Sequence, residues 1–133
     1  MRHHVLLASY LHYIRRQNPL QPVPASSPNL PSPYLASRLT ITKAYEFALD
    51  HVGLDTLSTP IWKEYLAFIK EGETRTTWEE QGKVADLRKV YTRVLKIPVE
   101  DVESIWREYD MFEGQVNKIT VSPRLWLAIC LAS

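Results

Sequence analysis

The amino-acid sequence predicts an all-α fold built from antiparallel helical hairpins. Apolar residues recur with the i, i+3, i+4 spacing of amphipathic helices in several segments, and no segment shows the period of two that strands require. A short aromatic motif also returns at a nearly constant spacing, which is typical of a helical repeat protein. The length of 133 residues allows one domain.

The first expected helix covers residues 1–16, with Leu7 and Tyr10 on one face. Residues 17–37 follow it and contain six of the nine prolines of the chain. Prolines remove backbone donors and bias the residues before them toward extended conformations. We therefore expect residues 17–37 to form an extended Pro-rich linker, with neither a helix nor a central strand.

Helical repeats are expected over residues 38–120. The helix that carries Tyr45 should end at Gly53, in the left-handed conformation that glycine adopts easily. The next helix should begin with Thr59 as its N-cap. Pro60 then occupies the first helical position, where its missing N–H removes no hydrogen bond.

The last two expected helices carry their own boundary signals. Thr77 and Glu80 have the spacing of a capping box, in which the hydroxyl accepts an amide of the first turn and the carboxylate returns to the cap. That helix should stop before Pro98, and Asp101 should cap the final helix. Residues 121–133 do not continue the pattern and are expected to form an apolar tail.

A seven-residue motif, W-x-x-Y-x-x-[FY], connects three of these helices. Trp62 begins one copy, Trp106 begins another 44 residues later, and Leu7 takes the tryptophan position in a third. A second pattern around Tyr45 returns 46 residues later around Tyr91. The helices therefore alternate in the order A, B, A, B, A, and we expect the recurring side chains to fill the core rather than to bind a ligand. The predicted structural repeat residues are Leu7, Tyr10, Tyr45, Trp62, Tyr65, Tyr91, Pro98, Trp106 and Tyr109.

The strings AYEFALDHVGLD, PIWKEYLAFIK, WEEQGKVADLRKVYTRVLKIP and VESIWREYDMFEGQVNKIT resemble the HAT (half-a-TPR) repeats of RNA-processing scaffolds. They are similar above all to the suppressor-of-forked family, the HAT-repeat subunit of cleavage stimulation factor and of the fungal mRNA 3′-end cleavage factor. The resemblance covers about residues 5–16 and 39–120. It implies a TPR-like HAT solenoid of about two and a half repeats.

The same resemblance implies a non-catalytic scaffold of pre-mRNA cleavage and polyadenylation. The implied location is the nucleus, with a cytoplasmic pool as an alternative. Its partners would be protein subunits of the cleavage and polyadenylation complex, through which any RNA contact would be made, and no membrane is implied. Members of the family have many more repeats, so we expect their homodimerisation regions to be absent from this chain.

The tail at 121–133 departs from the family. Val121 and Ser122 are what an intron donor sequence GTAAGT encodes in frame, so we interpret the tail as read-through of an unspliced intron. A truncated fragment without independent function is therefore an alternative to the scaffold interpretation.

The sequence contains no pattern of catalytic or cofactor-binding residues. His3, His4 and His12 lie close together, but no carboxylate precedes Glu46 to complete a local metal site. Cys130 is the single cysteine, so neither an internal disulfide nor a cysteine zinc site can form. We therefore expect no enzyme activity, no cofactor and no metal.

Charge is distributed unevenly along the chain, although the formal net charge is only +1. The first 45 residues carry five basic and no acidic residues, whereas the remaining 88 carry 11 basic and 15 acidic residues. A basic region beside aromatic side chains can bind RNA. A direct RNA-binding module is therefore the alternative function, and its candidate contacts are Arg15, Arg16, Arg38 and Lys43.

Overall fold

The computed structural model describes residues 2–120 of the chain, and its helices confirm the all-α prediction. The predicted tail at 121–133 lies outside the described residues. In the described part there is no strand, and no helix there is long and apolar enough to cross a membrane. The elements are α1 (Arg2–Gln17), α2 (Ser32–Val52), the short 3-10 helix η1 (Thr56–Ser58), α3 (Thr59–Glu71), α4 (Thr77–Leu95) and α5 (Val102–Thr120).

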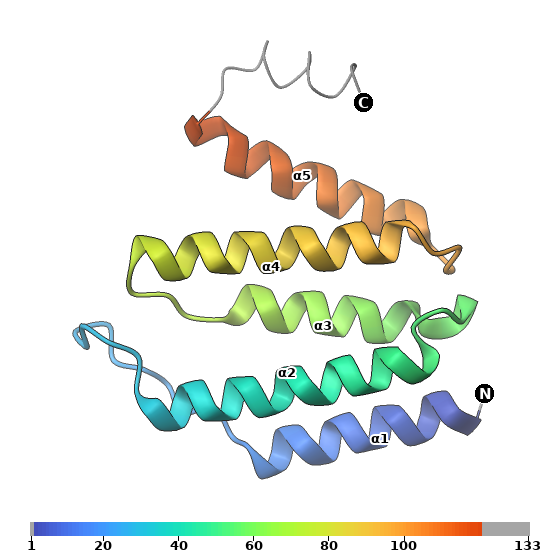
Figure 1. The fold of residues 1–133 in the computed structure, drawn as a ribbon, viewed down its shortest axis with the longest axis horizontal. Helices are drawn as coiled ribbons and strands as arrows, with labels where there is room; N and C mark the ends of the chain where they lie inside the picture. The colour runs from blue at the N-terminus through green and yellow to red at the C-terminus, as the bar shows by residue number, and fades with distance from the viewer. Residues whose placement is uncertain (1, 121–133) are drawn as a thin grey trace. The chain divides into compact units, whose positions relative to one another are not determined.

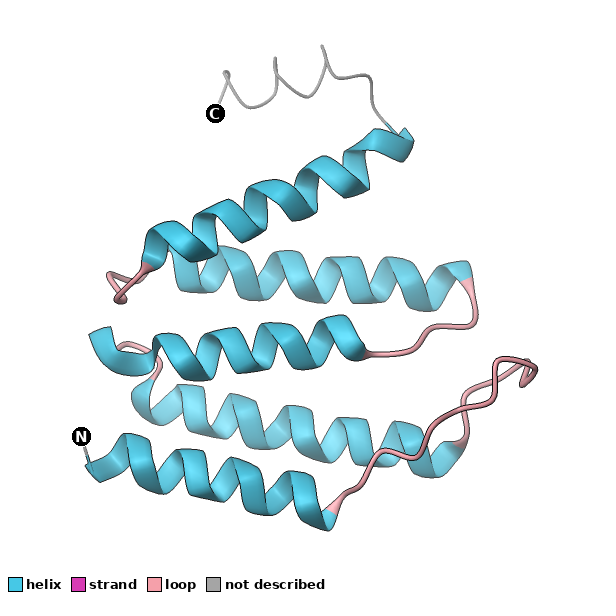
Figure 2. Cartoon of the chain, turned by 180° about the vertical axis from the view of Figure 1, so that it is seen from behind, coloured by secondary structure: helices cyan, strands magenta, loops and turns pink. Residues whose placement is uncertain are grey.

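Two compact units divide the chain: Met1–Glu100, which holds α1 to α4, and Asp101–Ser133, which holds α5. In the first unit α1 packs on α2, α2 on α3 and α3 on α4. Successive helices of this unit run in opposite directions (Figure 1). Their connections lie alternately at the two ends of the helices, as the view from behind also shows (Figure 2). The first unit therefore consists of two helical hairpins, α1/α2 and α3/α4, in the predicted A, B, A, B order.

The core of the first unit is formed by aromatic rings between the hairpins. Tyr45 of α2 stacks on Tyr65 of α3 with the ring centroids 5.2 Å apart, and the Phe68 ring lies 5.5 Å from Tyr45. Trp62 is only 2% exposed. The copy of the motif that begins at Trp62 therefore packs in this core. The other buried apolar residues of this unit are Leu11, Tyr34, Ile41, Ala44, Ala48, Leu49, Val52, Ile61, Leu66, Ile69, Leu87, Val90, Tyr91, Val94 and Val99.

The prediction that residues 17–37 contain no helix is wrong over its last part, because α2 begins at Ser32. Pro33 lies in the first turn of α2, where no intrahelical hydrogen bond needs its N–H and its restricted φ suits a helix. Pro31 precedes the helix in an extended conformation, with φ of −63° and ψ of 144°. The Pro-rich linker in the structure therefore covers residues 18–31.

Arg75, in the loop between α3 and α4, holds this linker in place. Its Nε donates to the carbonyl of Ser27 at 3.2 Å, and its Nη2 donates to the carbonyls of Pro24 at 3.2 Å and Val23 at 3.4 Å. The carboxylate of Glu73 accepts from the same Nη2 at 2.8 Å. A guanidinium presents several donors in a fixed plane, which suits it to bind carbonyls of a chain without regular structure.

We expect Arg75→Ala to release the linker without unfolding the helices. The three carbonyls lose their donor, which should lower local stability by about 1–2 kcal/mol and raise proteolytic cleavage of residues 18–31 by roughly tenfold. Limited proteolysis followed by mass spectrometry measures this rate. Arg16→Ala removes an exposed arginine of α1 and serves as the control, with no expected change. Equal cleavage of the Arg75→Ala variant and the unaltered chain would contradict the anchoring role.

The start of the second hairpin differs from the sequence prediction at two residues. Gly53 has φ of −60° and is not left-handed, because its carbonyl is directed at the side chains of Trp62 and Ser58, which donate to it at 3.1 and 3.0 Å. Thr59 is the first residue of α3 and not its N-cap, because η1 runs directly into α3 and leaves no extended residue there. Its hydroxyl instead donates to the carbonyl of Glu100 at 2.5 Å.

The capping box of α4 is displaced by one residue from the predicted position. Thr76, and not Thr77, is the N-cap, and its hydroxyl accepts the N–H of Glu79 at 3.1 Å. Glu79, and not Glu80, returns its carboxylate to the backbone, where it accepts the N–H of Arg75 at 2.9 Å. Because threonine and glutamate each occur as a pair, both registers agree with the sequence. The extended backbone of Thr76, with φ of −122° and ψ of 158°, decides between them.

The boundaries around α5 follow the prediction more closely. α4 ends at Leu95, before Pro98, and α5 begins at Val102, directly after Asp101. Asp101 has φ of 56°. This is the left-handed region, which aspartate adopts more readily than most other residues with a side chain.

Candidate protein-interaction groove

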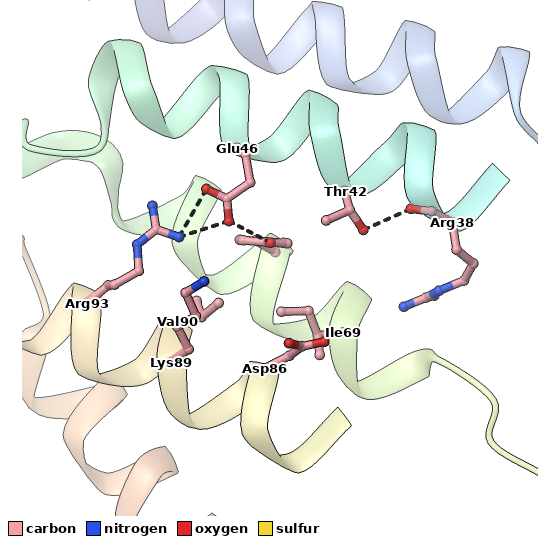
Figure 3. Close-up of a pocket in the computed structure, with 9 residues that line it drawn as sticks. Arg38, Thr42, Glu46, Ile69, Asp86, Lys89, Val90 and Arg93 are labelled. Atoms are coloured by element: carbon pink, nitrogen blue, oxygen red, sulfur yellow. Dashed lines mark hydrogen bonds and ion pairs between the residues drawn. The ribbon is translucent and has the colours of Figure 1, made fainter. Parts of the chain in front are cut away.

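A groove of about 340 Å³ lies between α2, α3 and α4 of the first unit (Figure 3). α2 contributes residues spaced four apart, which places them on one helix face, and α4 contributes residues three or four apart. The buried side chains of α3 lie between these two faces. The lining residues are Arg38, Thr42 and Glu46 of α2, Tyr65 and Ile69 of α3, and Asp86, Lys89, Val90 and Arg93 of α4.

One hydrogen-bonded network joins the three helices across this groove. Nη1 of Arg93 lies 2.8 Å from Oε1 and 3.0 Å from Oε2 of Glu46, and the Tyr65 hydroxyl donates to Oε1 at 2.8 Å. The dashed lines of Figure 3 follow these contacts from α4 to α2 and α3. Glu46 therefore holds both B helices and the A helix between them at one point.

This network shifts the pKa values of its members. Burial by itself raises the pKa of Glu46, but the hydrogen bonds from Arg93 and Tyr65 outweigh it and hold the pKa below its usual value. Burial and the hydrogen bond to the Glu46 carboxylate raise the pKa of Tyr65 well above its usual value. At neutral pH the geometry therefore favours an ionised Glu46 and a protonated Tyr65.

We expect Glu46→Gln to destabilise the first unit by about 1 kcal/mol at neutral pH. The effect is modest because Glu46 and Arg93 keep 38% and 34% of their side-chain surfaces exposed. Since the pKa of Glu46 is lower in the folded chain, its contribution is present above the usual pKa of a glutamate. It is lost as the pH falls through that value toward the folded one.

Urea unfolding at neutral and at acidic pH measures this contribution. The difference between the unaltered chain and Glu46→Gln should shrink at acidic pH. Asp86→Asn is the matched control, because Asp86 lines the same groove and makes no hydrogen bond or ion pair in the described part of the chain. An equal pH dependence of the two variants would contradict the role of Glu46.

Two further charged residues of the groove are available to a partner. Lys89 and Asp86 are exposed, and neither has a hydrogen bond or ion pair within residues 2–120. Together with the polar network beside them, they can form hydrogen bonds and ion pairs with a protein segment laid across the groove. Among the described residues, no three His, Cys, Asp or Glu side chains lie close enough together to hold a metal ion.

Two of the predicted RNA contacts, Arg15 and Arg38, lie against a core ring instead of forming a free basic patch. The Arg38 guanidinium lies 3.8 Å from the centroid of the Phe68 ring and donates to the Phe68 carbonyl at 2.8 Å. The Arg15 guanidinium lies 5.6 Å from the same ring and 3.6 Å from the Glu71 carboxylate. Both arginines therefore flank one buried ring of the core, which is a packing role.

The other two predicted RNA contacts, Arg16 of α1 and Lys43 of α2, are exposed. The structure therefore does not bring the four basic residues together as one free patch. Direct RNA binding stays a prediction, and it rests on these two side chains.

The predicted repeat residues fall into two groups. Tyr45, Trp62, Tyr65 and Tyr91 are buried, as a core role requires. The others are half-buried or exposed: Leu7, Tyr10, Pro98, Trp106 and Tyr109.

The two exposed aromatic residues of this set have different surroundings. Tyr10 is 38% exposed, and its ring meets Phe47 edge-on at 5.7 Å, whereas the neighbouring Leu11 is 1% exposed and takes the core position. Trp106 is 58% exposed, and its ring lies 6.1 Å from Tyr109 on the same helix. An A helix is enclosed only when a B helix follows it, and α5 is the last helix that the structure describes.

The groove residues Glu46, Lys89 and Arg93 are not among the residues predicted from the sequence. A signal was present, because Arg38, Thr42 and Glu46 recur every fourth residue on the helix that carries the apolar stripe. The partner of Glu46 lies 47 residues away in the chain. No local pattern connects two residues so far apart.

Comparison with known proteins identifies relatives of the chain. A family model described as "Suppressor of forked protein (Suf)" matches residues 2–124. The mRNA 3′-end-processing protein RNA14 of Cryptococcus neoformans var. neoformans serotype D (strain JEC21) is 44% identical over 118 residues, which cover 89% of this chain and 10% of the relative. The corresponding proteins of Schizosaccharomyces pombe and Neurospora crassa are 41% identical over 111 residues and 40% identical over 118 residues. They are matched over 84% and 86% of this chain and 14% and 9% of their own lengths, so the chain spans about a tenth of these relatives.

Proposed function

Because the chain belongs to the suppressor of forked family, we propose that it is a non-catalytic component of the mRNA 3′-end processing machinery that presents its helices to partner proteins. The observation that carries this proposal is the family match over residues 2–124, together with relatives named as mRNA 3′-end-processing proteins. The proposed location is the nucleus, where pre-mRNA 3′ ends are made.

The geometry supports a protein-binding role for the first unit. Tyr45, Trp62, Tyr65 and Tyr91 are buried in the first unit, so these aromatic side chains are not available as a ligand site. The groove between α2 and α4 remains open and carries charged side chains at spacings that an extended protein segment can follow. Helical hairpin arrays commonly use such concave surfaces for partners. The proposed partners are protein subunits of the cleavage and polyadenylation complex.

Co-purification tests this proposal. The tagged chain is incubated with nuclear extract of the organism that encodes it, and bound proteins are identified by mass spectrometry. We expect subunits of the cleavage and polyadenylation complex to be enriched over a tag-only control. Lys89→Glu reverses a charge in the groove and should lower their recovery several-fold. Lys43→Glu reverses an exposed charge of α2 that does not line the groove, and it should leave recovery unchanged.

Two outcomes would contradict the proposal at different levels. If no subunit of the complex is enriched, the role in 3′-end processing fails for this chain. If subunits are enriched but Lys89→Glu behaves like Lys43→Glu, the groove is not the contact surface.

Dependence on salt concentration distinguishes direct RNA binding from the proposed protein-binding role. Phosphate contacts weaken steeply as the salt concentration rises. With Arg15 and Arg38 held against Phe68, we expect filter binding to a U/G-rich RNA to be negligible at moderate ionic strength. Salt-sensitive binding that is lost in an Arg16→Glu, Lys43→Glu double variant would favour the alternative.

A further inference from the structure

The Pro-rich linker carries a short segment with the spacing of a protein ligand. Pro19 and Pro22 are separated by two residues, and Arg16 stands three residues before Pro19, so the segment reads Arg-x-x-Pro-x-x-Pro. All three side chains are exposed. Neither the core nor the groove uses them.

Residues 19–22 of this segment make no backbone hydrogen bonds in the described part of the chain. The Asn18 N–H donates to the carbonyl of Ile14, and the next backbone hydrogen bond joins the Ser27 N–H to the carbonyl of Pro24. Between them, no backbone group of residues 19–22 takes part in a hydrogen bond within the described part of the chain. Unbonded carbonyls and fixed proline φ values are the properties of a polyproline II strand, which has no hydrogen bonds of its own.

The segment is also held at its C-terminal end. Arg75 donates to the carbonyls of Val23 and Pro24, directly after Pro22. A segment restrained at one end loses less conformational freedom when it binds than a free chain does, and this raises its affinity for a partner.

We propose that residues 16–22 form a ligand for an SH3 domain. A polyproline II helix has three residues per turn, so Pro19 and Pro22 lie along one edge and can enter the two aromatic-lined pockets of such a domain. Arg16 continues the same edge once the last turn of α1 opens, which helix ends do readily. Its guanidinium then pairs with the carboxylates beside those pockets. This surface is separate from the groove, so the inference does not depend on the proposed function.

A second proline pair in the linker provides the matched control. Pro28 and Pro31 have the same spacing as Pro19 and Pro22, but the residue three positions before Pro28 is Ala25, which cannot form an ion pair. The chain is also turned at this place, because the Ser27 hydroxyl donates to the carbonyl of Asn29 at 2.7 Å. The second pair therefore lacks the preceding charge, and it follows a turned stretch of chain.

Calorimetric titration of the full chain tests the proposal. The probe is an isolated SH3 domain that selects peptides of the form Arg-x-x-Pro-x-x-Pro. We expect saturable binding that weakens by at least about tenfold in the Pro19→Ala, Pro22→Ala double variant and in Arg16→Glu. The Pro28→Ala, Pro31→Ala double variant should bind within about twofold of the unaltered chain. Circular dichroism confirms that all variants keep their helices.

Two results would overturn the proposal. One is the absence of saturable binding by the unaltered chain. The other is equal weakening in the two proline double variants, since binding would then not select the segment that follows Arg16.

Discussion

Trp62→Ala is expected to lower the free energy of unfolding of the first unit by about 3–5 kcal/mol. A small domain is stable by only about 5–15 kcal/mol, so this loss is a large part of the total. The change should move the midpoint of urea unfolding, followed by circular dichroism, to a much lower denaturant concentration.

Three features of Trp62 account for the size of this effect: its burial, a hydrogen bond and a contact with a cation. The side chain is 2% exposed, so its removal leaves a cavity in the core. Its Nε1 donates to the carbonyl of Gly53 at 3.1 Å, and that bond is lost in a buried place. The Arg93 guanidinium lies 5.3 Å from the centroid of its ring, at a distance where a cation is attracted to an aromatic face.

Trp78→Ala is the control for this substitution. Trp78 is 82% exposed, in the first turn of α4. Its removal takes away the same number of atoms without opening a cavity, so we expect a change within about 0.5 kcal/mol. A comparable loss of stability in both variants would contradict the assignment of Trp62 to the core.

Gly53→Ala is expected to destabilise the first unit by about 2 kcal/mol or more. Gly53 is buried where α2 ends, and an added Cβ would overlap the carbonyl of Leu49 and lie 3.3 Å from the Trp62 ring. The Gly53 N–H donates to the same Leu49 carbonyl at 2.7 Å. The new methyl group therefore distorts this hydrogen bond and presses against the Trp62 ring.

Gly82→Ala should act in the opposite direction. Gly82 lies inside α4, and nothing is within 4 Å of the position that its Cβ would take. Because glycine is a poorer helix former than alanine, the substitution should stabilise the first unit by about 0.5–1 kcal/mol. Urea unfolding of both variants under the same conditions measures the two signs, and a shift of the same sign in both would refute the steric argument at Gly53.

Much of the fold could be predicted because the apolar side chains of each helix are spaced three or four residues apart in the sequence. The alternation of A and B helices was visible in Trp62 and Trp106 and in Tyr45 and Tyr91, since each motif lies within two turns of one helix. The start of α2 was predicted too late because six prolines were weighed together. A proline inside a first turn, as Pro33 is, favours a helix rather than ending it.

The candidate site could not be predicted in the same way. The ion pair across the groove joins Glu46 to Arg93, 47 residues away, and the linker is bound by Arg75, which is 48 residues from Ser27. From the local sequence alone, these residues are ordinary charged side chains of helices and loops. They meet their partners only when the hairpins pack against each other.

The sequence by itself determined the helical class, the A, B, A, B order of the first unit and the core positions of Tyr45, Trp62, Tyr65 and Tyr91, because each follows from side chains three or four residues apart on one helix. The tertiary structure alone decided the right-handed conformation of Gly53, the position of Arg15 and Arg38 against Phe68, and the charges that face the groove. Each of these depends on which helix surfaces pack against each other. Such packing brings together residues that are far apart in the sequence, so no short-range pattern predicts their contact.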